Sequence, residues 1–174
     1  MRKTVLTFGL FAGAVLSLGM AVPMLFFDDL GFDTGEILGY TTMVAAFAVV
    51  YFAVRSYREN VGHGVISFGR AFRLGIGIIA IANVCYVATW QVIYATAMPD
   101  FMEKYSAHTI EKAKTDGTPA AELEKLTADM AKWTELYKNP LIRSGITFLE
   151  PPPVGLLVVL VSAALLRRTD ATPA

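Results

Sequence analysis

The stretch LGIGIIAIANVCYVATWQVIYATAM, residues 74–98, holds 25 residues and no charged side chain. About 20 helical residues cross the hydrocarbon core of a bilayer, where every backbone amide must find its partner within the segment. We therefore predict that residues 74–98 form a transmembrane helix, which places the chain among integral membrane proteins.

Three further runs are long and apolar. Residues 4–27 and 37–54 carry no charge over 24 and 18 residues, and residues 144–166 contain one ionisable side chain, Glu150. The first run exceeds the core of a signal peptide, about 7 to 15 residues, so we expect it to be retained. These runs predict an all-α membrane protein, a single domain over residues 1–174 with four transmembrane helices at about 4–27, 37–54, 74–98 and 141–167.

The composition agrees with this class. Hydrophobic residues make up 55% of the 174 residues, charged residues make up 17%, and the mean hydropathy is +0.50. Because 15 Lys and Arg balance 15 Asp and Glu, no basic surface is available for phosphates, and we expect no nucleic-acid partner. The single cysteine, Cys85, forms no internal disulfide, and neither histidine has a cluster of ligands nearby in the sequence. We expect no metal site and no cofactor.

Basic residues in the short loops predict the orientation, because positive charge is retained in the cytoplasm. The loop between the second and third spans carries Arg55, Arg58, Arg70 and Arg73, whereas the loop between the first two spans carries only acidic charges. Both ends of the chain are also basic, so we predict that both termini are cytoplasmic. The four arginines are expected to set this topology, and binding of anionic lipid headgroups is the alternative role.

Residues 100–139 are predicted to form a helical hairpin outside the cytoplasm, between spans three and four. Asp116 and Gly117 separate its two helices. The second helix carries an apolar stripe at helical spacing, formed by Leu123, Leu126, Met130, Trp133 and Tyr137. This stripe either packs within the hairpin as a lid or serves as a surface for a protein partner, for self-association or for the membrane.

Several segments resemble one known family in the same order along the chain. They are GEILGYT (35–41), RSYR (55–58), ISFGRAF (66–72), PDFMEKY (99–105), LYKNP (136–140) and FLEP (148–151). The family is domain-of-unknown-function family 4199, which comprises small four-span proteins of the bacterial inner membrane. The resemblance implies this topology and location and implies no reaction.

Glu150 is the strongest candidate for a functional residue. The apolar run after the prolines, residues 154–166, has 13 residues and reaches only about 20 Å as a helix. The fourth span must therefore begin earlier, with Asn139 as N-cap and Pro140 as first helical residue, which puts Glu150 inside the membrane region. The prolines that follow it predict a kink or break, since they remove amide donors: Pro151, Pro152 and Pro153.

Helical rise places other polar residues at a similar depth. We hypothesise an intramembrane polar site formed by Glu150, Gln91, Tyr40 and Tyr94. Removal from water would favour the protonated carboxyl of Glu150, which could donate a hydrogen bond or carry a proton. In the alternative interpretation, Glu150 caps amides or reaches the interface and the prolines merely end a helix. Gln91 and Asn83 are also candidates for bonds between helices, and Gly9 and Gly13 for close helix packing.

No catalytic motif occurs in the chain, since the sequences typical of serine hydrolases, zinc proteases and phosphate-binding loops are missing. We expect a non-catalytic membrane module or accessory subunit. The alternative is a small proton-coupled transporter or carrier that uses Glu150 at the proline-broken fourth helix. A third hypothesis, a membrane-surface enzyme, would use Glu36, Glu150 or His108.

Overall fold

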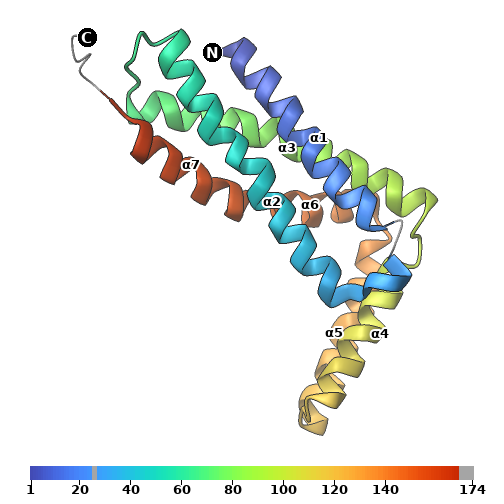
Figure 1. Ribbon diagram of the computed structural model, residues 1–174. Coiled ribbons are helices and arrows are strands. Elements are labelled where there is room, and N and C mark those ends of the chain that lie inside the picture. Colours follow the sequence, from blue (N-terminus) through green and yellow to red (C-terminus); the bar gives the residue numbers. More distant parts are fainter. Residues whose placement is uncertain (25–26, 169–174) are drawn as a thin grey trace.

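The computed structural model describes residues 1–24 and 27–168, apart from the side chains of 27–30. Residues 25–26 of the predicted first span and residues 169–174 lie outside this described part. The described chain is helical and has no named strand, which confirms the all-α class (Figure 1). The helices are α1 (Arg2–Met24), α2 (Phe27–Asn60), α3 (Phe68–Thr96), α4 (Phe101–Thr115), α5 (Ala120–Tyr137), α6 (Pro140–Leu149) and α7 (Pro152–Leu166).

Within residues 1–24 and 27–168, four apolar segments are long enough to cross a membrane. They are Arg2–Met24, Gly31–Asn60, Phe68–Thr96 and Pro140–Leu166, the last combining α6 and α7. α2 and α3 each pack against both α1 and α7, so these four helices form one bundle. Its core is apolar, with Phe47, Leu74 and Ile78 fully buried.

Small residues allow the helices to approach closely. A Cβ atom on Gly13 of α1 would lie 2.8 Å from Cys85 Sγ on α3, and one on Gly155 of α7 would lie 2.7 Å from Ile79 Cδ1. Such distances leave no room for a side chain. The predicted close packing through glycine is therefore confirmed for Gly13 and for Gly9, where a Cβ atom would lie 2.9 Å from Ile81 Cβ. This packing lets α1 lie directly against α3.

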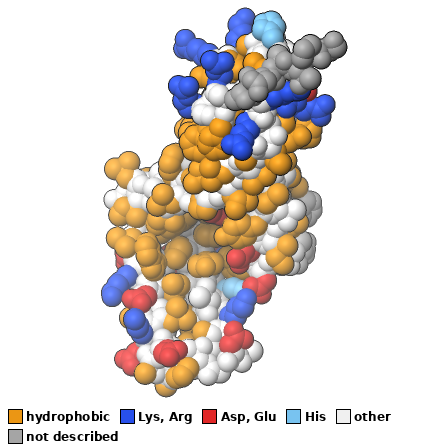
Figure 2. All heavy atoms as spheres, turned by 90° about the vertical axis from the view of Figure 1, so that its left-hand side faces the viewer, with side chains coloured by type: hydrophobic (Ala, Val, Ile, Leu, Met, Phe, Trp, Pro, Cys, Tyr) orange, Lys and Arg blue, Asp and Glu red, His pale blue; other side chains and the backbone are white. Residues whose placement is uncertain are grey.

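The outer surface of the bundle is apolar, as a surface that faces lipid must be. Large hydrophobic side chains project outward from every long helix, among them Leu18 (64% exposed), Val84 (62%) and Leu157 (65%). On the face drawn in Figure 2, hydrophobic side chains form a broad band, with Lys and Arg gathered beyond it at one end. We call this end, where α1 begins, α7 ends and the α2–α3 loop lies, the terminal end, and the opposite end the hairpin end.

The helical hairpin is formed by α4 and α5, which pack against each other and project from the hairpin end (Figure 1). Gly117 in the connecting turn has a φ of 76°, a conformation that glycine adopts without strain. The second span also differs from its expected limits, because α2 extends back to a kink at Gly31, where φ is 67°. This extension puts Asp33 and Glu36, predicted to lie in a loop, on a helix.

Candidate functional site

A cavity of about 700 Å³ lies where the hairpin meets the hairpin end of the bundle. Helices α1 to α6 all contribute side chains to it, so it exists only because the hairpin folds against the bundle. We call it the hairpin-side cavity. Residues that define its different walls include Met20, Glu36, Tyr40, Trp90, Trp133 and Glu150.

Aromatic and methionine side chains make up nearly half of the residues that line the cavity. Both tryptophans of the chain, Trp90 and Trp133, line it. Phe101 packs edge-on against Trp90, with ring centroids 4.8 Å apart. Five methionines complete the wall, namely Met20, Met24, Met43, Met102 and Met130. Methionine adapts its shape to irregular surfaces, so this wall can accommodate an apolar group without a fixed outline.

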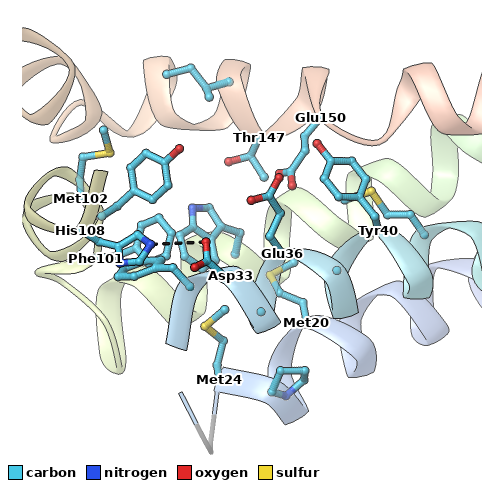
Figure 3. Close-up of a pocket in the computed structure, with 18 of the residues that line it drawn as sticks. Met20, Met24, Asp33, Glu36, Tyr40, Phe101, Met102, His108, Thr147 and Glu150 are labelled. Atoms are coloured by element: carbon cyan, nitrogen blue, oxygen red, sulfur yellow. Dashed lines mark ion pairs between the residues drawn. The ribbon is translucent and has the colours of Figure 1, made fainter. Parts of the chain in front are cut away.

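Two acidic side chains point toward each other across the cavity. Figure 3 shows the carboxyl groups of Glu36, from α2, and Glu150, from the end of α6, facing one another. They lie close enough to interact electrostatically. The Tyr86 hydroxyl donates a hydrogen bond of 3.0 Å to Glu150 Oε2, whereas Glu36 forms no hydrogen bond or ion pair with any described residue.

The break in the fourth span presents Glu150 to the cavity. α6 starts with the predicted cap, in which Asn139 Oδ1 accepts from Leu141 N at 2.9 Å, and it ends at Leu149. α7 starts at Pro152, so Pro152 and Pro153 occupy its first turn, where a missing amide costs little. The interruption is confined to Glu150 and Pro151, and Asn83 Nδ2 donates to the Phe148 carbonyl beside it at 2.8 Å.

The hypothesised polar site divides into two. Glu150 and Tyr40 line the cavity, whereas Gln91 and Tyr94 do not. Both surround the buried guanidinium of Arg143 instead: Gln91 Oε1 accepts from Arg143 Nη2 at 2.6 Å, and the Tyr94 ring centroid lies 3.8 Å from Arg143 Cζ. Sequence reasoning missed Arg143, because a basic residue just before an apolar run is typical of a charge at the membrane edge.

A third acid at the cavity, Asp33, is already neutralised. Lys112 Nζ of α4 lies 2.7 Å from Asp33 Oδ1, and His108 Nε2 lies 3.6 Å from the same oxygen. The hydrogen bond and charge of Asp33 raise the pKa of Lys112, which therefore stays charged. Glu36 and Glu150 are thus the acidic groups of the cavity that form no ion pair with any described residue, although Lys112 lies close enough to Glu36 to interact with it electrostatically.

The apolar stripe of the hairpin faces inward for much of its length. Met130, Trp133 and Tyr137 line the cavity, and Tyr137 accepts a hydrogen bond of 2.7 Å from Trp90 Nε1. Leu123 and Leu126 are half-buried. Binding of a partner by the stripe stays a prediction, because the inward packing does not test it.

The loop arginines lie at the terminal end, far along the bundle from the cavity. Arg55 pairs with Glu59 at 3.0 Å, and Arg58 Nη1 donates to the Leu166 carbonyl at the end of α7 at 3.4 Å. Arg73 Nε donates to the Gly69 carbonyl, while Arg70 lies near the start of α3.

Within the described part of the chain, no group of three or more His, Cys, Asp or Glu side chains is placed to hold a metal ion.

Comparison with known proteins assigns the family. No curated protein and no solved structure matches the chain. The family model described as "Protein of unknown function (DUF4199)" matches residues 7–168, which is most of the chain and includes every cavity residue named above. The protein therefore belongs to the DUF4199 family, as the order of its sequence motifs indicated.

Proposed function

We propose that the protein is a non-catalytic membrane module that binds an amphipathic small molecule in the hairpin-side cavity. The observation that carries this proposal is the cavity itself, whose volume is about 700 Å³ and whose walls combine aromatic and methionine side chains with a few polar groups. Binding sites for small molecules have this composition and enclose about 300–1,000 Å³.

The expected location is the bacterial inner membrane, with both termini in the cytoplasm. The support is the cluster of basic side chains at the terminal end, seen in Figure 2, together with the positive-inside rule. In this orientation the cavity opens on the extracytoplasmic side. A ligand would reach it from the outer leaflet or from the adjoining aqueous space.

A binding role fits better than passage across the membrane, because the bundle is closed below the cavity. Phe47, Val50 and Ile78 are each 0% exposed, and Val159 is 1% exposed. A module of this kind would hold its ligand or present it to another protein. The exposed part of the hairpin, including Trp133 at 44% exposed, is the surface on which we expect such a partner, or a second copy, to dock.

The experiment uses tryptophan emission, since both tryptophans line the cavity. The protein in dodecyl maltoside is titrated with triphenylphosphine oxide, an uncharged aromatic probe. Gly39→Leu should fill the cavity, because Gly39 lines it and a Cβ there meets no atom within 4 Å. Gly145→Leu, at an equally open position outside the cavity, is the matched control.

A saturable change in emission is expected for the wild type and for Gly145→Leu, and Gly39→Leu should weaken it at least tenfold. Equal, non-saturable responses in all three proteins would show only partition into detergent. That result would contradict the proposal.

A proton-coupled carrier is the second candidate, and the broken helix at Glu150 favours it, since transporter sites form where membrane helices are interrupted. To test this candidate, tetraphenylphosphonium is added to proteoliposomes that contain a pH-sensitive dye. The dye reports whether protons leave the vesicles. A carrier predicts a flux that Glu150→Gln abolishes while the protein still inserts. Absence of flux in the wild type, or flux that survives in Glu150→Gln, would reject this candidate.

A further inference from the structure

We infer that the ligand of the hairpin-side cavity is an organic cation, with a positively charged head between Glu36 and Glu150 and an apolar body against the aromatic and methionine wall. This inference rests on the proposed binding function and adds the chemical class of the ligand. It follows from the charges of the cavity, from its wall and from the arrangement of its oxygen atoms.

The acidic side chains of the cavity favour a cationic ligand. Asp33 is paired with Lys112, whereas Glu36 has no hydrogen-bond or ion-pair partner among the described residues. Glu150 accepts a hydrogen bond from a neutral hydroxyl, that of Tyr86, and faces Glu36 across the cavity (Figure 3). Two acids that face each other repel when both are ionised. A cation placed between them removes that repulsion and supplies the missing counter-charge.

The nearest buried cation does not fill this role. Arg143 directs its guanidinium to Gln91 Oε1 and to the Tyr137 carbonyl, and it is absent from the cavity wall. Lys112 lines the cavity but holds Asp33 at 2.7 Å. Neither basic side chain therefore forms an ion pair with Glu36 or Glu150, and a positive charge placed between the two acids would come from a ligand.

The wall determines what kind of cation fits. Aromatic rings attract a cation to their faces, and Trp90 and Tyr86 both line the cavity, with Tyr86 in contact with Glu150. Methionine and phenylalanine contribute no charge or strong hydrogen bond, so a hydrated metal ion would gain nothing from most of the wall. The described residues also lack a group of three acidic, histidine or cysteine ligands. An organic ammonium or phosphonium ion matches both parts of the cavity.

Hydroxyl and carboxyl oxygen atoms gather at one place in the cavity, which favours a ligand with a single charged group. Hydroxyl groups of Tyr40 and Thr147 lie beside the two carboxyl groups in Figure 3. These groups can accept hydrogen bonds from an ammonium ion, or simply present negative potential to a quaternary centre. The cavity therefore combines the acidic pair Glu36 and Glu150, the ion pair of Asp33 with Lys112, and a wall of aromatic and methionine side chains.

The test compares three probes of similar shape and different charge: tetraphenylphosphonium, tetraphenylborate and the neutral triphenylphosphine oxide. Tryptophan emission is measured in dodecyl maltoside, with protein-free micelles as blank. We expect tetraphenylphosphonium to bind at least tenfold more tightly than the neutral probe and tetraphenylborate to show no saturable binding. Such selectivity cannot arise from partition into an uncharged detergent alone.

Variants assign this selectivity to the acids. Glu36→Gln and Glu150→Gln should each weaken tetraphenylphosphonium binding about tenfold and leave the neutral probe unchanged. Glu124→Gln removes the same charge from an exposed position outside the cavity and should have no effect. Glu36 forms no hydrogen bond with a described residue, so Glu36→Gln should leave the fold intact. This variant therefore tests the role of the acids even where Glu150→Gln fails to fold.

The outcomes separate the inference from the function on which it rests. Equal binding of the cationic and neutral probes, unaffected by either glutamine, would overturn the inference and leave the binding function intact. Saturable binding of none of the three probes would overturn both. Preference for tetraphenylborate would also overturn the inference.

Discussion

The hydroxyl group of Tyr86 donates a hydrogen bond of 3.0 Å to Glu150 Oε2, joining α3 to the end of α6. One turn away on α3, Asn83 Nδ2 donates to the Phe148 carbonyl at 2.8 Å. A single face of α3 therefore holds both the backbone and the side chain of the broken helix. The position of Glu150 in the cavity depends on these two contacts.

The first prediction is that Tyr86 and Glu150 are energetically coupled. In a double-mutant cycle, Tyr86→Phe and Glu150→Leu, each of which removes one partner of the hydrogen bond, should destabilise the protein by less in combination than the sum of the single changes, with a coupling of about 0.5–3 kcal/mol. The measurement is thermal unfolding in dodecyl maltoside. Additive effects would mean that this hydrogen bond does not stabilise the protein at the break between α6 and α7.

The second prediction concerns the carbonyl at the break. Asn83→Leu leaves the Phe148 carbonyl without its donor, and it should lower the free energy of unfolding by about 1–3 kcal/mol. Val84→Ala changes an exposed neighbour on the same helix and serves as the control. A melting temperature for Asn83→Leu equal to that of Val84→Ala would contradict the role given to Asn83.

The third prediction tests the contact between α1 and α3. Gly13→Val should destabilise the bundle by about 1–3 kcal/mol, because the new side chain would overlap Cys85. Gly145→Val, where a Cβ meets no atom within 4 Å, should leave the melting temperature within a few degrees of the wild type. Equal melting temperatures for the two variants would rule out close packing at Gly13.

The fourth prediction concerns pH. Burial raises the pKa of Tyr137 above its ordinary value, so the unfolded chain loses this proton before the folded chain does. The neutral phenol therefore contributes its full stability below about pH 10, and this contribution is lost as the pH rises through the folded pKa.

Melting temperatures from pH 9 to 11 provide the measurement. The wild type should lose more stability over this range than Tyr137→Phe, and Tyr105→Phe, which removes an exposed hydroxyl, is the control. Identical slopes for the wild type and Tyr137→Phe would show that Tyr137 is not held neutral by burial.

Much of the fold was predictable because the relevant signals are local. Uncharged runs indicated the membrane helices, and Asn139 with Pro140 indicated where the fourth span begins. The proline run likewise indicated the position of the break. Each of these signals is contained in a few consecutive residues, so no knowledge of packing was needed.

The site was predictable only in part, because it depends on which helix faces meet. Helical rise estimates depth but gives no direction around the helix. Gln91 follows Trp90 by about 100° of rotation, so Trp90 points into the cavity and Gln91 points toward Arg143. Glu36 was assigned to a loop, because the extension of α2 to Gly31 is not visible in the pattern of apolar residues.

Equilibrium dialysis with tetraphenylphosphonium shows whether the hairpin-side cavity is a ligand-binding site. We expect one saturable site per chain in the wild type and in Gly145→Leu, and no such site in Gly39→Leu, whose side chain would occupy the cavity. Uptake that never saturates, or a site that survives in Gly39→Leu, would show that the cavity does not bind the probe.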